Sequence, residues 1–310
     1  MLSYFCRKLS FNVATLFVIV TLTFFLMKAI PGDPFTQEKA LPKEIHEALR
    51  QHYGLEDPLA LQYVRYLSSL IQWNLGPSFT HSGRTVNEII NSGFPISALL
   101  GLEALAIAIC LGIPLGILAA AKHNRWQDFS ILTATAIGSA APNFILATFL
   151  QYLLAFKLGW FPIARWGSFM HTVLPALSLA IFPAAFIARL IRSNMIEVLK
   201  QGYIKTAKAK GVAPLIVFFH HGLRNAILPV FTYLGQLTAS ILMGSFVVEK
   251  IFSIPGLGYW FVSSITNRDY TVIMGITVFY SIIMLSALTL VEIAYGVIDP
   301  RIRTYNAAIA

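Results

Sequence analysis

Six stretches of the chain are apolar for about 20 residues or more, and their length constrains the fold more than any other feature. An α-helix of about 20 apolar residues spans the hydrocarbon core of a bilayer. Only helices and closed barrels satisfy all their backbone hydrogen bonds there. We therefore predict an all-α, polytopic membrane protein with six transmembrane helices. The stretches lie at residues 9–30, 97–121, 129–158, 172–191, 226–248 and 271–297.

The polar segments between these stretches differ in charge. With the N-terminus, which carries Arg7 and Lys8, placed in the cytoplasm, the cytoplasmic segments hold 13 of the 23 Lys and Arg residues. They hold only three of the 14 acidic residues. This asymmetry follows the positive-inside rule and predicts that both termini are cytoplasmic. The net charge of +9 is spread over loops, which argues against a folded nucleic-acid-binding surface.

The longest polar interruption in the second half of the chain is residues 189–229. Within it, residues 203–211 are predicted to form a short helix with small residues on one face, which would let another backbone approach closely. That face carries Tyr203, Ile204, Ala207 and Gly211. The residues alone leave two interpretations open. One is a helix that docks on a cytoplasmic partner, and the other is a basic topogenic loop or a helix resting on anionic lipid.

Two acidic residues lie inside the apolar stretches, Glu103 and Glu292. Intramembrane carboxylates usually face protein or water. Glu103 could bind the amino group of a substrate, but a hydrogen bond to a neighbouring helix is the favoured interpretation. Glu292 is close to the inner end of its stretch, so pairing with basic residues at that surface is favoured over a substrate site.

The third and fifth apolar stretches contain residues that could line a pathway. Proline removes a backbone hydrogen bond and kinks a helix, so the third stretch could form a flexible gate or a static bend. Polar positions in the fifth stretch suit either tight packing or a water-facing wall. The candidate pathway residues are Glu103, Pro142, Asn143, Gln236 and Ser240.

Two longer segments are predicted to lie outside the membrane. Residues 42–53 and 58–73 of the first have helical patterns, and this segment could cap the bundle or contact an external soluble protein. The second, residues 249–270, contains Pro255, Gly256 and Gly258, which favour a tight turn.

No pattern of residues indicates an enzyme. The chain lacks G-x-x-x-x-G-K-[ST], G-x-S-x-G and H-E-x-x-H. Adjacent histidines, His220 and His221, point to different sides of a helix and are a poor metal site. Cys6 and Cys110 cannot form a disulfide framework. We expect no catalytic, cofactor-binding or metal-binding residues in this chain.

Several segments resemble one family. YIKTAKAKG followed by HHGLRNAILP is similar to the cytoplasmic coupling loop of bacterial binding-protein-dependent ABC importer permeases. Thr206, Ala207 and Lys208 occupy its E-A-A positions, with Gly211 and Pro229 as its glycine and distal proline. The missing glutamate, with Thr-Ala in its place, resembles the oligopeptide and dipeptide permeases. PGDPF, HYGLEDPLALQYVRYL, LGPSF, EKIFSIPGLG and RDY resemble the external regions of the same group, and the B-type oligopeptide subunit most of all.

The resemblance implies an ABC type-1 importer transmembrane domain in the bacterial cytoplasmic membrane. It would comprise residues 94–300, with a coupling loop at about 192–225, after a first span and external segment (1–93) and before a cytoplasmic tail (301–310). The implied coupling helix is near 196–211. The implied ATPase-coupling residues are Glu197, Tyr203, Ile204, Thr206, Ala207, Lys208, Gly211 and Pro229, and the external motif comprises Pro255, Gly256, Gly258, Arg268 and Asp269.

The same resemblance implies a set of partners and a cargo. The partners are a second, C-type permease subunit, two ABC ATPases that bind ATP-Mg, and an external substrate-binding protein. The cargo would be oligopeptides or dipeptides, with nickel chelates or glutathione as alternatives within the group. A different class, a proton-driven secondary transporter with Glu103 or Glu292 as relay, would be expected to show inverted repeats, and no convincing repeat is present.

Overall fold

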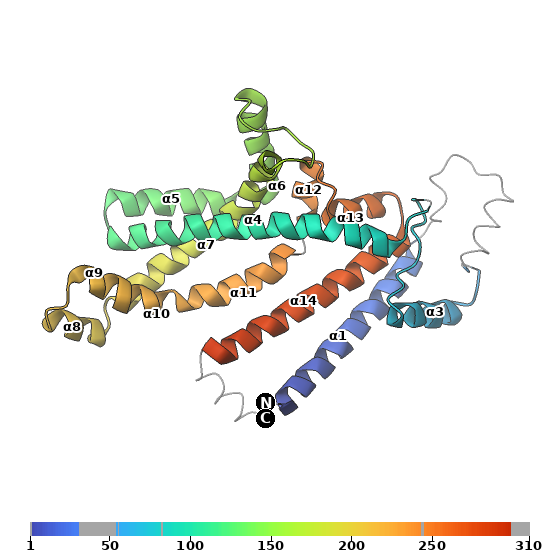
Figure 1. Ribbon diagram of the computed structural model, residues 1–310, viewed down its shortest axis with the longest axis horizontal. Coiled ribbons are helices and arrows are strands. Elements are labelled where there is room, and N and C mark those ends of the chain that lie inside the picture. Colours follow the sequence, from blue (N-terminus) through green and yellow to red (C-terminus); the bar gives the residue numbers. More distant parts are fainter. Residues whose placement is uncertain (1, 31–53, 55, 82, 243–244, 299–310) are drawn as a thin grey trace. The chain divides into compact units, whose positions relative to one another are not determined.

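The computed structural model describes residues 2–30, 54, 56–81, 83–242 and 245–298, and all the regular secondary structure in these ranges is helical (Figure 1). Two segments, η1 and η2, are π-helical. The elements are α1 (Leu2–Ala29), α3 (Leu59–Ile71), α4 (Val86–Ala121), α5 (Trp126–Ala140), α6 (Asn143–Leu150), η1 (Gln151–Lys157), α7 (Phe169–Val198), α8 (Gly202–Ala209), α9 (Pro214–Ile216), η2 (Val217–Leu223), α10 (Arg224–Ala226), α11 (Leu228–Leu242), α12 (Phe246–Ile251), α13 (Leu257–Thr266) and α14 (Tyr270–Ile298).

Four of these helices, α1, α4, α7 and α14, are each long and apolar enough to cross a membrane. The number rises to six if each of two bent helix pairs forms one span, which agrees with the six predicted apolar stretches. The helix at 58–73 is confirmed as α3, whereas the helix predicted at 42–53 lies outside the described residues.

The predicted third span is broken rather than gently kinked. α5 ends at Ala140, and α6 begins at Asn143 after a bend of 104°. Ala141 is extended, with ψ of 128°, because the ring of Pro142 disfavours a helical conformation at the residue before it. In contrast, α7 continues through Pro175 and Pro183, both of which are buried.

Two spans begin earlier than predicted. α4 starts at Val86, where Thr85 and Glu88 form a reciprocal capping box. The Glu88 amide donates to Thr85 Oγ1 (3.2 Å) and the Thr85 amide donates to Glu88 Oε2 (3.0 Å). The fifth span is helical from Pro214 and bends by 42° before α11, so His220 and His221 lie in η2 rather than in a loop.

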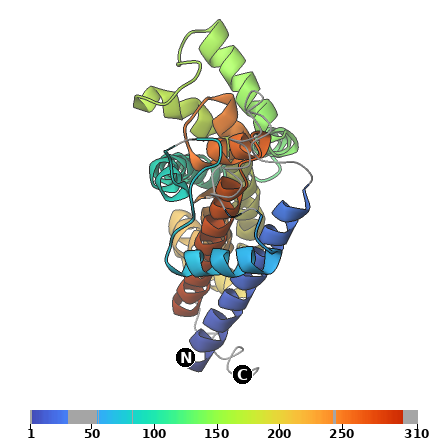
Figure 2. The same cartoon turned by 90° about the vertical axis from the view of Figure 1, so that its right-hand side faces the viewer.

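The described chain divides into two compact units, each built from separated sequence segments. The first contains α1, α3, residues 86–96 of α4, α13 and residues 270–285 of α14. In this unit α3 lies across α1 (Figure 2). The predicted domain boundary near residue 93 stays a prediction.

In the second unit, α4 and α7 pack through small residues. Gly112 and Gly116 form a G-x-x-x-G pattern on α4, which lets the backbones come close. A Cβ at Gly112 would lie 2.8 Å from the Ala184 carbonyl oxygen, and one at Gly116 would lie 2.6 Å from that of Ala188. α5 packs on α7 beside them, so α7 is the central helix of this unit (Figure 1).

Candidate functional site

The predicted coupling helix is shorter than expected and separate from α7. α7 runs to Val198, and α8 covers Gly202–Ala209 only. Gly211 ends α8, with φ of +78° in the left-handed region that glycine adopts without strain. The Gly211 amide donates to the Lys208 carbonyl (3.0 Å), and the Val212 amide to the Ala207 carbonyl (3.2 Å). Gly211 therefore closes the helix as a C-terminal cap.

The buried side of α8 includes one of the predicted coupling residues, Ile204. Ile204 is 0% exposed and belongs to the side of α8 that packs toward η2. The neighbouring Tyr203 hydroxyl accepts a hydrogen bond from Asn225 Nδ2 (3.0 Å). Ile204 therefore anchors α8 to its own chain and is not available to a partner in this structure.

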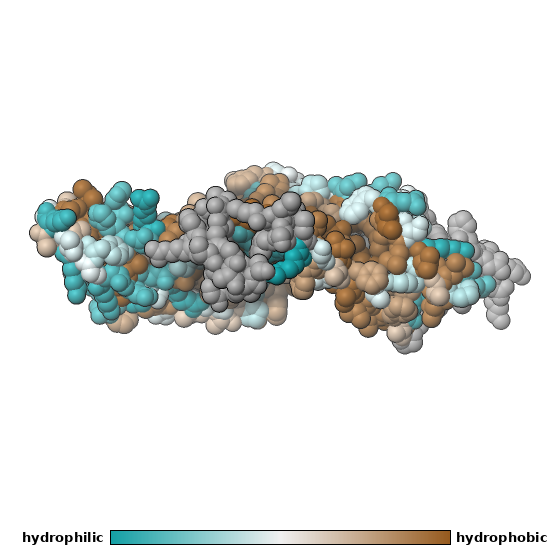
Figure 3. Space-filling view, turned by 90° about the horizontal axis from the view of Figure 1, so that it is seen from below, coloured by the Kyte–Doolittle hydropathy of each residue, from teal (hydrophilic) through white to brown (hydrophobic). Residues whose placement is uncertain are grey.

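The exposed side of α8 lies opposite Ile204. Successive residues are 100° apart, so Gly202, Thr206 and Ala209 lie on this opposite side, and all three are exposed. Tyr203 flanks them and is 46% exposed. Hydrophilic side chains gather at the end of the unit that carries α8 (Figure 3). The structure thus presents a small-residue surface on the side opposite to the predicted one.

The remaining predicted coupling residues surround α8. Glu197 is exposed in the last turn of α7. Ala207 is half-buried and Lys208 is exposed. Pro229 is the second residue of α11, at the 42° bend, where the missing amide of proline accounts for a break in the helix.

A buried ion pair, which sequence reasoning missed, braces α7 shortly before α8. The guanidinium of Arg192 donates to both oxygens of Asp128, from Nε (2.5 Å) and from Nη2 (2.7 Å). The Asn124 amide (3.0 Å) and the His123 ring also contact this carboxylate, which is 1% exposed. A bidentate pair of this kind fixes the end of α7 against α5. The sequence does contain one indication of this pair. Asp128 is the only acidic residue between the second and third apolar stretches, in an otherwise basic segment.

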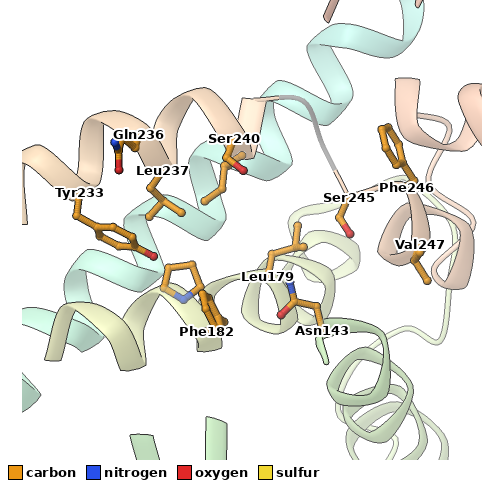
Figure 4. Close-up of a pocket in the computed structure, with 12 residues that line it drawn as sticks. Asn143, Leu179, Phe182, Tyr233, Gln236, Leu237, Ser240, Ser245, Phe246 and Val247 are labelled. Carbon is orange, nitrogen blue, oxygen red and sulfur yellow. The ribbon is translucent and has the colours of Figure 1, made fainter. Parts of the chain in front are cut away.

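A cavity of about 560 Å³ lies among α6, α7, α11 and α12 (Figure 4). It contains three of the predicted pathway residues, Asn143, Gln236 and Ser240. Figure 4 shows the ring of Tyr233 directed from α11 toward α7, where its centroid lies 4.3 Å from that of Phe186. The lining residues that the structure describes carry no charge, and they offer hydrogen bonds and aromatic contact. The remaining lining residues are Leu179, Phe182, Pro183, Leu237, Ile241, Ser245, Phe246 and Val247.

The other two predicted pathway residues do not line this cavity. Pro142 precedes α6 as its N-cap residue, directly before Asn143. Glu103 lies on α4, and its Oε2 atom is buried without a hydrogen-bond partner among the described residues. The favoured interpretation, a hydrogen bond to a neighbouring helix, therefore finds no support at this oxygen.

The predicted external motif organises a turn in the first unit. Asp269 is fully buried, and its carboxylate accepts from Thr80 Oγ1 (2.8 Å), Thr271 Oγ1 (2.9 Å), the Phe79 amide (3.2 Å) and the Ser78 hydroxyl. These donors compensate for the burial of its charge and hold residues 78–80 at the start of α14. This contact joins two of the segments, LGPSF and RDY, that carried the resemblance.

The rest of the external motif shapes the turn before α13 and α14. Gly256 is the N-cap of α13, and Gly258 is buried in its first turn. Pro255 precedes them and lies between α12 and α13. Arg268 adopts φ of +56° just before Asp269.

Comparison with known families decides the assignment. Residues 112–304 match the family "Binding-protein-dependent transport system inner membrane component", and residues 1–100 match its N-terminal membrane component. The chain belongs to this family. Its members are non-catalytic membrane permeases of ABC importers, so the chain is an integral membrane permease rather than an enzyme.

Relatives are similar over nearly their whole length. The dipeptide transport system permease protein DppB of Bacillus subtilis is 49% identical over 306 residues, which cover 99% of each chain. The oligopeptide transport system permease protein OppB of Haemophilus influenzae is 40% identical over 305 residues, covering 98% of this chain and all of that one.

Solved structures support the fold at lower identity. An amino acid ABC transporter superposes with a TM-score of 0.55 at 18% identity, covering 67% of this chain and 92% of that one. The MetNI methionine ABC transporter gives 0.52 at 16% identity, covering 66% and 95%. The fold is therefore that of ABC type-1 importer permeases.

Proposed function

We propose that this chain is a permease subunit of an ATP-driven importer of dipeptides or oligopeptides. The observation that carries the proposal is the 49% identity to a dipeptide permease across 99% of both chains. The names of the relatives favour peptides over nickel chelates or glutathione. By analogy with the B-type subunits among them, this chain forms half of a pathway with a second, C-type permease subunit.

ATP hydrolysis by the partner subunits is coupled to transport through their contact with α8. The chain carries no nucleotide-binding motif, so ATP-Mg binds to two partner ATPases. Each ATPase contacts one permease through a short helix, and here the available surface is Gly202, Thr206 and Ala209, flanked by Tyr203 and Lys205. Glycine and alanine let the partner backbone approach closely. Lys205 supplies a positive charge for acidic groups at the edge of the contact.

The cavity of the second unit is part of the pathway wall. Its amide and hydroxyl groups at Asn143, Gln236 and Ser240 can hydrogen-bond the backbone of any peptide. Since the described lining residues are uncharged, we expect them to bind peptides without selecting a charged side chain. An external substrate-binding protein supplies selectivity, and rigid-body motion of the helices alternates access.

We place the protein in the bacterial cytoplasmic membrane with both termini and α8 in the cytoplasm. The excess of Lys and Arg in the segments on that side supports this orientation. The external segments, including the turn held by Asp269, then face the binding protein.

The test is uptake of a radiolabelled dipeptide by proteoliposomes that contain this chain, its partner permease and the two ATPases, with binding protein added outside. We expect uptake to require both the ATPases and ATP inside the liposomes. Unlabelled dipeptide should inhibit this uptake, whereas glutathione and nickel chelate should not. Uptake by this chain alone, driven by a proton gradient, would instead support a secondary transporter. Selective inhibition by glutathione or by a nickel chelate would instead identify that compound as the class of substrate.

A further inference from the structure

The first unit contains an amphipathic helix with three chemically distinct sides, which the importer function does not use. α3 (Leu59–Ile71) contacts α1 through Tyr63 and Tyr66, and the half-buried Leu67 and Leu70 lie on the same side of the helix. About 100° away, Gln62, Arg65 and Ser69 form a polar strip.

The third side of α3 is apolar and exposed. Leu61 is 42% exposed, Val64 61% and Ile71 87%, and Ser68 lies between them on the same side. An amphipathic helix that packs by one side normally turns polar residues outward. α3 instead exposes a second apolar side. An exposed apolar surface of this kind indicates contact with another apolar partner.

The contact between α3 and α1 determines how deep α3 lies in the membrane. The Phe24 ring lies 5.2 Å from the Tyr63 ring and 5.5 Å from the Tyr66 ring, and the hydroxyls of Thr21 and Tyr63 are 2.7 Å apart. Thr21 is eight residues before Ala29, the end of the apolar span. At 1.5 Å per residue, α3 therefore crosses α1 within about 12 Å of the end of that span. The contact therefore lies in the half of the roughly 30 Å hydrocarbon core nearest that end of α1, at the level of the acyl chains of one leaflet.

The surroundings of α3 agree with this depth. α1 also exposes apolar side chains, Phe17, Leu22 and Leu26, which are 54%, 57% and 61% exposed, so both helices present apolar surface that their mutual contact does not cover. The Tyr66 hydroxyl oxygen is buried on the contact side, and this burial, together with the nearby Tyr63, raises its pKa. Arg65 pairs with Asp57 on the polar strip, where a long basic side chain can reach water and lipid phosphates.

We propose that α3 is an interfacial membrane helix, with Leu61, Val64, Ser68 and Ile71 inserted among the acyl chains of the outer leaflet. α1 and α3 then form a two-helix anchor, one helix across the bilayer and one along its surface. The partner of this surface is lipid rather than the external binding protein.

Two adjacent serines provide a matched test, because serine and cysteine have similar shapes. Ser68 lies on the apolar exposed side and Ser69 on the polar strip. Ser68→Cys and Ser69→Cys, each in a chain with Cys6 and Cys110 replaced by serine, are labelled with bimane and assembled with the ATPases and partner permease in proteoliposomes. Phosphatidylcholine with brominated acyl chains is one quencher, and aqueous iodide is the other.

We expect brominated lipid to quench most of the emission at position 68 and little at position 69, with the opposite order for iodide. Iodide quenching at position 68 would overturn the proposal, because that side would then face water. Protection of position 68 from both quenchers would also overturn it, since protein would then cover the face. Dipeptide uptake by the same variants is measured separately, so a failure of the anchor and a failure of the import function are distinguishable.

Discussion

At the scale of single residues, Gly211 has a conformational role that differs from the one its position suggested. The small face predicted for the coupling helix included Gly211 as a place for close backbone approach. In the structure nothing lies within 4 Å of the position that a Cβ would take, and φ is +78°. Conformation rather than space therefore selects glycine here.

Gly211→Val should destabilise the end of α8, because a branched L-residue in the left-handed region costs about 1–2 kcal/mol. Gly211→Asn should be close to wild type, since asparagine tolerates this region. Thermal unfolding of the purified complex and dipeptide uptake measure both effects. Equal loss in the two variants would show that small volume, not backbone conformation, is required.

The sequence alone could not decide which side of α8 packs on its own chain, and it did not reveal the Asp128–Arg192 pair. In the sequence from 202 to 211, small residues fall on both sides of the predicted helix, Gly202 and Ala209 on one and Ala207 and Gly211 on the other, so periodicity alone cannot decide which side faces the chain. The burial of Ile204 shows which side faces the chain, and that burial depends on packing against η2 (Val217–Leu223), a separate element. The Asp128–Arg192 pair was missed for the same reason, because the two residues are 64 positions apart.

At the scale of elements, composition predicted the spans well and their breaks poorly. Apolar length alone identifies a helix that can cross a bilayer, because the bilayer sets that length. Proline is less informative. Pro142 accompanies a bend of 104°, whereas Pro175 and Pro183 leave α7 unbroken. The packing around each proline decides the outcome, and one sequence does not contain it.

The α4–α7 contact gives a prediction at this scale. Gly116→Ala would place a methyl group 2.6 Å from the Ala188 carbonyl, and overpacking of this kind costs about 1–3 kcal/mol. We expect a lower unfolding temperature of the purified complex and weaker uptake. Gly167→Ala is the matched control, because its nearest contact would be at 3.4 Å. An unfolding temperature unchanged at Gly116 would contradict close packing of these two helices.

At the scale of the whole molecule, a permease must transmit motion because it does not hydrolyse ATP. α8 is joined to α7 by three residues, and the Arg192–Asp128 pair ties that end of α7 to α5. Both α7 and α6 line the cavity. A displacement of α8 therefore reaches the proposed pathway through packed helices and a buried ion pair, which are rigid connections.

The most direct test of this account uses Ala209, on the exposed side of α8. The measurement is ATP-dependent dipeptide uptake, with ATP hydrolysis, by the complete complex carrying Ala209→Glu or Ala209→Ser. The account predicts that Ala209→Glu abolishes uptake and its coupling to hydrolysis, while Ala209→Ser and the amount of protein inserted in the membrane stay near wild type. Normal uptake with Ala209→Glu would contradict the account, because the proposed ATPase contact would then tolerate a large, charged side chain.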